Sequence, residues 1–436
     1  MRSLKTLLFF VFIGLSVLTC SDRKEYTATG KVHVMREGEH YTLIRDQVPF
    51  VIKGVAGFTH LKELRDAGGN TIRTWDTTNL QNILDSAQHY HIAVVAGLPL
   101  YNSNHVKEYY SDSQAVNKLH QKMEAIVNRY KNHPALLMWC LGNELHYFYE
   151  PQDDFFTAYN NLLKMIHRKD PDHPVTTALL GFGRKNIYHV RTKVPDLDII
   201  SINTYGRISS LKEDLDHFSW FWDGPFVVGE WGINGYWESD STAWGAPIED
   251  TSTKKAERYK SIYTTLMPYD NPRYLGSLVF YWGFQHEKTP TWFSMFSDDG
   301  AKSASIGSLT TLWNGPTVLH PGPPLNYMLV DQKGAHDNLI FQPNTVHQAE
   351  ILLTQPAEGL RLRWEVRPED WYKEQFDDSN KNKIPPPALD SLLSQVDGLN
   401  ATFRVPKTEG PYRIYCWIYD AYGNFASANT PFYVVK

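Results

Sequence analysis

Residues 50–75 read FVIKGVAGFTHLKELRDAGGNTIRTW, and this stretch decides the fold class. The apolar run at 50–55 predicts a short buried strand. Residues 61–67 then carry apolar side chains at helical spacing until two glycines, at 68–69, stop the helix. A second apolar run, at 70–75, follows at once. Strand, helix and strand in so short a space are typical of a parallel sheet covered by helices.

The same alternation continues along the chain. Apolar strand-like runs recur at residues 92–98, 135–141, 175–179, 197–203, 226–230 and 276–282. Helical spacing recurs at residues 80–87, 116–130, 159–166, 211–218, 256–266 and 305–313. Eight strands of this kind predict an α/β fold, a (β/α)8 TIM barrel, over residues 50–315. An open doubly wound sheet is the alternative, but the first strand-to-helix turn, Gly54-Val55-Ala56-Gly57, lacks its three-glycine pattern.

The segments on either side of the barrel have a different pattern. Within the lead-in 21–49, two short apolar runs predict a hairpin on the barrel floor. The proline-rich residues 316–324 predict a linker, and period-2 alternation follows it. Strand-like runs there predict a C-terminal Ig-like or fibronectin-III-like β-sandwich over residues 325–436, which we interpret as an accessory domain. These runs are residues 349–353, 360–366, 401–405, 412–421 and 430–435.

Residues 1–20 predict a lipoprotein signal peptide. Arg2 and Lys5 precede the apolar run Leu7–Leu18, which is too short to cross a bilayer. The run ends in Val17-Leu18-Thr19-Cys20, which resembles the lipobox of bacterial lipoproteins, where the cysteine is lipidated. We therefore expect an exported lipoprotein of the bacterial cell envelope, in the outer membrane, periplasmic or surface-facing, with a membrane anchor at Cys20. Plain secretion is the alternative.

Composition narrows the class of function. With 43 basic and 48 acidic residues, the net charge of −5 argues against a nucleic-acid partner. Three cysteines without CxxC or Cys/His spacing predict no metal site, and Cys140 and Cys416 are expected to be buried thiols. The 13 Trp and 25 Tyr residues provide more flat amphipathic rings than a core requires, which favours a flat polar ligand.

Two carboxylates stand at predicted strand ends. The fourth strand ends in Met138-Trp139-Cys140-Leu141-Gly142-Asn143-Glu144, and the seventh ends in Val227-Val228-Gly229-Glu230-Trp231-Gly232. Burying a carboxylate costs several kcal/mol unless it is paired, so this placement favours function. The carboxyl ends of barrel strands carry the active site, and a gap of about 5 Å between two carboxylates suits retaining glycoside hydrolysis.

The strings at residues 137–144, 198–205 and 225–232 resemble the barrel of glycoside hydrolase family 2, a member of clan A. The strings at residues 52–55 and 69–73 are also similar to family 72, the fungal β-1,3-glucanosyltransferases. The resemblance spans about residues 45–315.

The resemblance implies catalytic roles for the strand-end residues. Glu144 would be the general acid/base and Glu230 the nucleophile. Arg73 and Tyr205 would donate hydrogen bonds around Glu230 and keep it ionised. Asn143 would hydrogen-bond the 2-OH of the sugar.

Neighbouring side chains are candidate substrate contacts. Trp282, at the end of the eighth strand, would form the floor of the subsite by stacking on the sugar. The further candidates are Trp75, Asp76, His146, Asn203 and Trp231.

The sequence therefore predicts an exported retaining β-glycosidase that cleaves a β-linked oligo- or polysaccharide without metal or cofactor. The alternatives are a β-glucanosyltransferase of the same fold and a catalytically inactive carbohydrate-binding surface lipoprotein. The sequence makes no prediction of oligomeric state.

Overall fold

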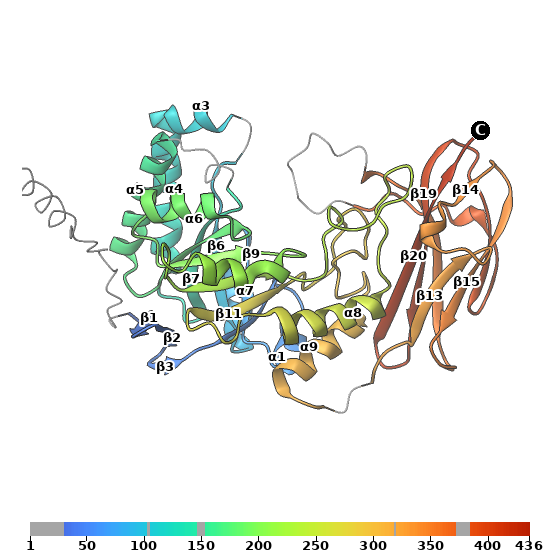
Figure 1. The fold of residues 1–436 in the computed structure, drawn as a ribbon, viewed down its shortest axis with the longest axis horizontal. Helices are drawn as coiled ribbons and strands as arrows, with labels where there is room; N and C mark the ends of the chain where they lie inside the picture. The colour runs from blue at the N-terminus through green and yellow to red at the C-terminus, as the bar shows by residue number, and fades with distance from the viewer. Residues whose placement is uncertain (1–29, 103–104, 146–152, 318–319, 372–383) are drawn as a thin grey trace, which may run out of the picture.

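The structure is a computed structural model that describes residues 30–102, 105–145, 153–317, 320–371 and 384–436. The predicted signal peptide with Cys20, and the candidate contact His146, lie outside these ranges. Figure 1 shows the two parts of the described chain, a helix-covered barrel and a body of β-strands at the C-terminal end.

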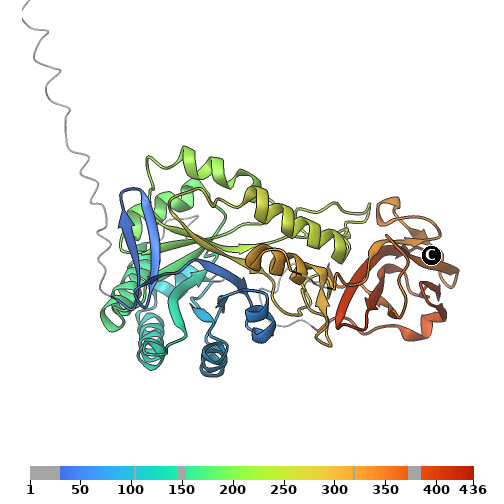
Figure 2. The same cartoon turned by 90° about the horizontal axis from the view of Figure 1, so that it is seen from below.

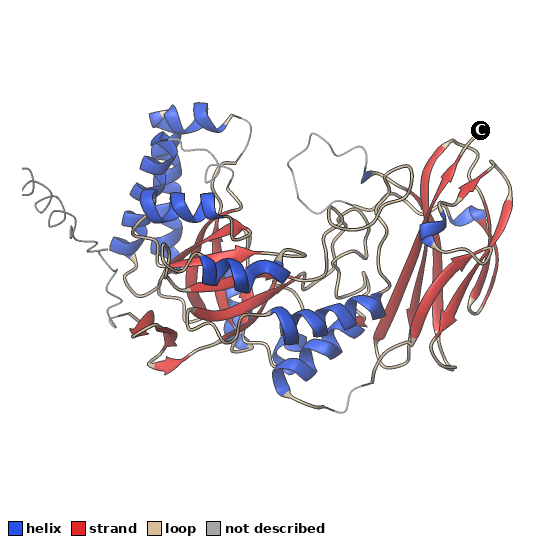
Figure 3. Cartoon of the chain, viewed as in Figure 1, coloured by secondary structure: helices blue, strands red, loops and turns tan. Residues whose placement is uncertain are grey.

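A closed parallel barrel forms the larger part (Figure 3). Its strand order runs β4-β5-β6-β7-β8-β9-β10-β11 and returns to β4, so the predicted (β/α)8 barrel is confirmed and the open sheet is excluded. The strands are β4 (Ile52–Ala56), β5 (Thr71–Arg73), β6 (Ala93–Leu98), β7 (Leu136–Asn143), β8 (Val175–Leu180), β9 (Ile199–Asn203), β10 (Phe226–Trp231) and β11 (Tyr274–Phe280).

Helices cover the outside of the barrel. They are α1 (Leu61–Asp66), α2 (Leu80–His89), α3 (Val106–Ser111), α4 (Ser113–Tyr130), α5 (Asp153–Lys169), α6 (Arg184–Lys193), α7 (Ile208–His217), α8 (Ser252–Ser261) with its π-helical extension η2 (Ile262–Leu266), and α9 (Ala304–Asn314). The sequence did not predict α3 or α6. None of the helices in the described ranges has the length and hydropathy needed to span a bilayer.

A hairpin closes one end of the barrel (Figure 2). Its strands are β1 (Val32–Glu37), β2 (His40–Arg45) and β3 (Val48–Pro49). Apolar side chains of β1 and β2 pack with the barrel interior in one buried cluster. The backbone N–H of Val32 donates to the Asp172 carbonyl, just before β8, and that of Tyr41 donates to the Pro272 carbonyl, just before β11. The hairpin therefore lies at the amino ends of the strands.

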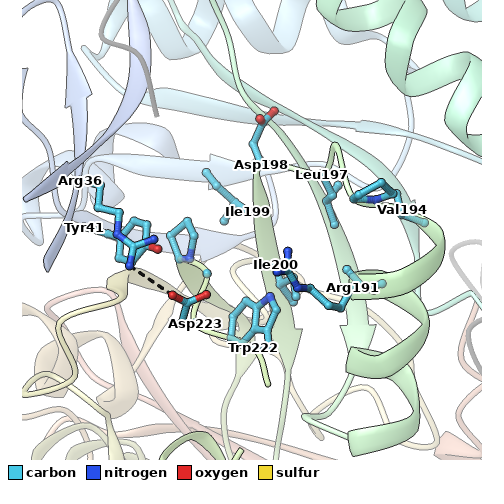
Figure 4. Close-up of a pocket in the computed structure, with 14 residues that line it drawn as sticks. Arg36, Tyr41, Arg191, Val194, Leu197, Asp198, Ile199, Ile200, Trp222 and Asp223 are labelled. Carbon is cyan, nitrogen blue, oxygen red and sulfur yellow. Dashed lines mark hydrogen bonds and ion pairs between the residues drawn. The ribbon is translucent and has the colours of Figure 1, made fainter. Parts of the chain in front are cut away.

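A pocket lies beside this hairpin (Figure 4). It is lined by the start of β9, by the segment just before β10, by α6 and by the ion pair between Arg36 and Asp223, whose nitrogen and oxygen are 3.2 Å apart. The pocket is at the floor of the barrel, opposite the strand ends that carry the predicted site, and it contains none of the predicted catalytic residues.

The C-terminal part contains two sheets that share one apolar core. One has the order β12-β20-β19-β16, with β14 also on β20, and the other has the order β13-β15-β18-β17. The strands are β12 (Lys302–Ser303), β13 (Leu325–Val330), β14 (Ile340–Phe341), β15 (Val346–Leu353), β16 (Arg361–Pro368), β17 (Leu393–Asp397), β18 (Asn400–Arg404), β19 (Gly410–Tyr419) and β20 (Asn424–Val434), with short turns of 3-10 helix at Ala335–Asp337 and Asp390–Leu392.

The barrel and the C-terminal sheets are joined by a polar, buried contact. β12 belongs to the segment between β11 and α9, yet it pairs with β20 of the C-terminal sheet. The Arg413 guanidinium on β19 donates to the Glu369 carboxylate, to the Asn429 side chain and to the backbone carbonyl of Pro247 in the β10–α8 segment. Barrel loops are therefore fixed against the second part of the molecule.

Candidate active site

Four polar side chains leave the barrel strands at their carboxyl ends. Arg73 is the last residue of β5, Asn143 of β7 and Asn203 of β9, while Glu230 is next to last in β10. Glu144 follows β7 directly. Because a closed barrel brings all its strand ends to one face, residues far apart in sequence meet there.

Irregular pairing precedes both glutamates. The register of β7 on β8 shifts between Cys140 and Asn143, and that of β10 on β9 shifts between Val228 and Glu230. An extra residue at a bulge re-aims the side chains that follow it. Gly229 is required here, since a Cβ atom at that position would lie 2.9 Å from the Cβ of Ser201. Glu144 itself has a φ of +48°, which is uncommon for a residue with a side chain.

Glu230 is held by three donors. Its Oε1 accepts hydrogen bonds from Arg73 Nη1 at 2.7 Å and from Trp75 Nε1 at 2.9 Å, and its Oε2 accepts one from the Tyr205 hydroxyl at 2.9 Å. Only 5% of Glu230 is exposed. These donors fix the position and orientation of the Glu230 carboxylate, and Arg73 places a positive charge beside it. Burial, and then the charge of Glu230, raise the pKa of the Tyr205 phenol well above its usual value, so the phenol stays a donor.

Glu144 has the opposite environment. Burial, and then the negative charge of Glu230, raise the pKa of Glu144 to about 7, although the Asn203 hydrogen bond and Arg73 act in the other direction. Its Oε1 accepts one hydrogen bond, from Asn203 Nδ2 at 2.8 Å. A carboxyl group whose pKa lies near neutral pH can both give and take a proton, which is the requirement for a general acid/base.

The two asparagines connect these groups and fix each other's amides. Asn143 Oδ1 accepts from Arg73 Nη2 at 2.5 Å, and from Asn203 Nδ2 at 3.3 Å. Since a guanidinium can only donate, the oxygen of Asn143 must face Arg73, and its amide NH2 is directed elsewhere as a donor. Asn203, predicted only as a substrate contact, bridges Arg73 and Glu144.

Two predicted substrate contacts are wrong. Trp282 is fully buried, its Nε1 donates to the His60 carbonyl at 3.3 Å, and its ring packs on Phe296. Trp231 is also fully buried, with its ring beside Tyr259 of α8 and Tyr263 of η2. An enclosed ring has no face for a sugar. Because side chains alternate along a strand, Glu230 points into the barrel and Trp231 points out toward the helices.

Trp75 and Asp76 are the remaining candidate contacts within the described residues. Trp75 is half-buried and contacts the nucleophile candidate through its indole N–H. Asp76 accepts the backbone N–H of Thr78 and so shapes a local turn. Sequence analysis missed Trp237, whose ring meets Tyr205; it lies in a segment without strand or helix periodicity, so no pattern indicated it. Within the described ranges, His, Cys, Asp and Glu side chains form no group of three or more that could hold a metal ion.

The sequence of the barrel is similar to that of known proteins. Residues 59–232, which include Arg73, Glu144 and Glu230, match the family model for the TIM barrel domain of glycosyl hydrolases family 2. The chain is 31% identical over 142 residues to the β-glucuronidase of Felis catus, and 30% identical over 146 residues to that of Homo sapiens. Each match covers 33% of this chain and 20% of the relative. The chain thus matches about a fifth of the length of these relatives.

Solved structures agree at the level of the fold. A Bacteroides uniformis β-glucuronidase superposes with a TM-score of 0.51 at 12% identity, covering 93% of this chain and 48% of that one. A Faecalibacterium prausnitzii β-glucuronidase gives 0.51 at 20% identity, covering 66% and 52%. The barrel is thus similar in sequence to the TIM barrel domain of glycosyl hydrolases family 2 and in fold to the barrels of these β-glucuronidases.

Proposed function

We propose that this protein is a retaining β-glycoside hydrolase. The observation that carries the proposal is the pairing of Glu144, whose pKa is raised to about 7, with Glu230, whose carboxylate accepts hydrogen bonds from Arg73, Trp75 and Tyr205. Unequal carboxyl groups of this kind are what a double-displacement mechanism needs.

The reaction has two steps. In the first, Glu144 gives its proton to the glycosidic oxygen while Glu230 attacks C1, so the C1–O bond breaks and a glycosyl-enzyme ester forms. In the second, Glu144 takes a proton from water, and the resulting hydroxide displaces Glu230 from C1. The NH2 of Asn143, which its bond to Arg73 directs away from the network, is positioned to hydrogen-bond the sugar 2-OH.

The substrate is a β-linked oligo- or polysaccharide. The curated relatives are β-glucuronidases, so β-glucuronides belong in the panel of substrates to be tested. The likeness of residues 52–55 and 69–73 to family 72 supports transfer to an acceptor sugar as the second outcome. Product analysis separates hydrolysis from transfer, and failure to turn over any β-linked glycan would favour an inactive carbohydrate-binding protein.

Stereochemistry tests the roles of the two glutamates. Glu230→Gly should be inactive, but azide can occupy the vacated space and should yield an α-glycosyl azide from an activated β-glycoside. Glu144→Ala should still form the glycosyl-enzyme from substrates whose leaving group needs no proton, and azide should then give the β-product. An α-anomer as first product of the wild type would mean inversion and would remove the nucleophile role of Glu230.

The proposal extends to location and to the C-terminal part. The lipobox-like ending at Cys20 supports export and lipid anchoring in the cell envelope. Cys20→Ala should move the protein from the membrane fraction to the soluble exported fraction, and unchanged fractionation would contradict the anchor. The shared core of the two C-terminal sheets supports an Ig-like or fibronectin-III-like sandwich that acts as an accessory domain.

A further inference from the structure

One exposed aromatic ring stands directly beside the catalytic residues. Trp237, in the segment between β10 and α8, is 51% exposed. Its ring meets that of Tyr205 at 5.4 Å between centroids and at 88°, and the Tyr205 hydroxyl in turn donates to Glu230. A large apolar ring in this position is not needed to fill a core, since half of it is open to solvent.

The chain is built to hold this ring in place. A Cβ atom on Gly235 would lie 2.3 Å from a carbon of the Trp237 indole, so the ring folds over the Gly235 backbone and can keep this position only if residue 235 is glycine. The next residue, Glu238, accepts the backbone N–H groups of Gly206 at 2.8 Å and of Gly235 at 3.2 Å. Because Gly206 follows Tyr205, this carboxylate ties the Trp237 segment to the catalytic tyrosine.

We propose that Trp237 is a stacking platform for a sugar ring in the subsite adjoining the cleaved bond, and that Gly235 and Glu238 position it. This inference rests on the proposed glycosidase function and specifies its substrate as an oligosaccharide with at least two β-linked pyranose rings. The stacked sugar presents its apolar C–H face, and the flat apolar face of the indole complements it. Tyr205 lies beside the sugar ring that reacts, and Trp237 stacks on the sugar ring next to it.

The test measures binding separately from turnover. A panel of β-linked di- to hexasaccharides of gluco, galacto, manno, xylo and glucurono configuration is titrated calorimetrically into the full chain carrying Glu144→Gln, which blocks turnover. Adding Trp237→Ala should weaken the tightest binder about 10- to 100-fold, whereas Trp237→Phe should keep most of the affinity. Gly235→Ala should reproduce much of the loss with the tryptophan still present, because the new methyl group displaces the ring.

Trp220→Ala is the matched control. Trp220 is 79% exposed but follows α7, near the barrel floor, so its removal should leave binding unchanged. In the active enzyme, Trp237→Ala should lower kcat/KM for the oligosaccharide at least tenfold more than for a small aryl glycoside of the same reacting sugar. Equal losses of kcat/KM on both substrates would show that Trp237 only supports Tyr205, and would overturn the platform. An affinity that Trp237→Ala leaves unchanged would also overturn the platform. So would a Glu144→Gln chain that binds no member of the panel. Binding without turnover would instead refute the proposed hydrolase and leave the platform to be judged by the titrations.

Discussion

Arg73 and Glu230 at the carboxyl end of the barrel, and Arg413 and Glu369 in the C-terminal part, are two buried ion pairs of the same composition. Their nitrogen–oxygen distances are 2.7 and 2.5 Å, and each arginine side chain is 1% exposed. All three nitrogens of Arg413 have partners. Arg73 Nε, by contrast, has no hydrogen-bond partner among the residues that the structure describes.

The difference lies in what stands next to each pair. Beside Glu230 is a second carboxyl group, Glu144, whose pKa is about 7 in part because Glu230 is charged. Burial raises the pKa of Glu369 against the opposing effect of Arg413. The second carboxylate near this pair is Glu249, and its pKa is lowered despite burial, mainly by Lys255 and less by Arg413. A buried ion pair alone therefore says little about function. A buried pair that sets the protonation of a third group at a strand end identifies the site.

The largest expected effect comes from Glu230→Gln. Loss of the nucleophile should lower kcat/KM on an activated aryl β-glycoside by at least about 10⁴-fold. Folding should change little, because removing the charge of Glu230 lowers the pKa of Glu144, which then ionises and compensates Arg73. Steady-state kinetics and thermal unfolding check both points. Residual activity above about 1% of wild type would exclude Glu230 as the nucleophile.

Arg413→Met should show the reverse pattern. Breaking a buried ion pair on one side leaves an uncompensated charge and typically costs about 3–5 kcal/mol of unfolding free energy. We expect a clear loss in denaturant titrations, partly recovered in the double variant Arg413→Met/Glu369→Gln. Activity at low temperature should remain within about threefold of wild type, since Arg413 contacts none of the catalytic groups. A loss of turnover without loss of stability would mean that the two regions are not separate in role.

The strand-end residues could be predicted from sequence because barrel closure does not depend on local detail. Apolar strands alternating with helices specify that the ends of β5, β7, β9 and β10 meet, whatever their separation along the chain. The direction in which a single side chain points was harder to predict from the sequence. Trp231 was misplaced because one residue of register turns a side chain to the other face, and no sequence pattern indicates the register shift before Glu230 in β10. Trp282 lies beyond the end of β11, where strand alternation no longer predicts the direction of a side chain.

The missed elements have physical reasons of their own. In α6, the sequence RKNIYHVRTK is mostly basic and polar, so it lacks the apolar stripe from which a helix is predicted. The connection between β8 and β9 nevertheless has to cross the outside of a parallel sheet, and a helix is its usual form. Trp237 belongs to an irregular segment whose position is set by Glu238 and Gly206, a contact between distant residues.

The raised pKa of Glu144 predicts that the stability of the protein depends on pH. Since its pKa is about 7 in the folded protein and about 4.5 as a free group, the folded state binds more protons between these values. Stability therefore falls as pH rises through this window, by about 3.4 kcal/mol at most. The side chain in Glu144→Gln cannot ionise. The Tm of this variant relative to that of the wild type should therefore rise as the pH increases from 5 to 8. Parallel Tm curves would contradict the raised pKa.

The smallest effect isolates one donor of the three around Glu230. Trp75→Phe keeps an aromatic ring beside Arg73 but removes the indole N–H that donates to Glu230 Oε1 at 2.9 Å. Because Arg73 and Tyr205 still donate to the same carboxylate, the loss should be about 1.5 kcal/mol, or roughly tenfold in kcat/KM. Steady-state kinetics check the rate, and the Tm of Trp75→Phe should stay close to that of the wild type. A Tm that falls together with the rate would show that Trp75 acts through packing alone.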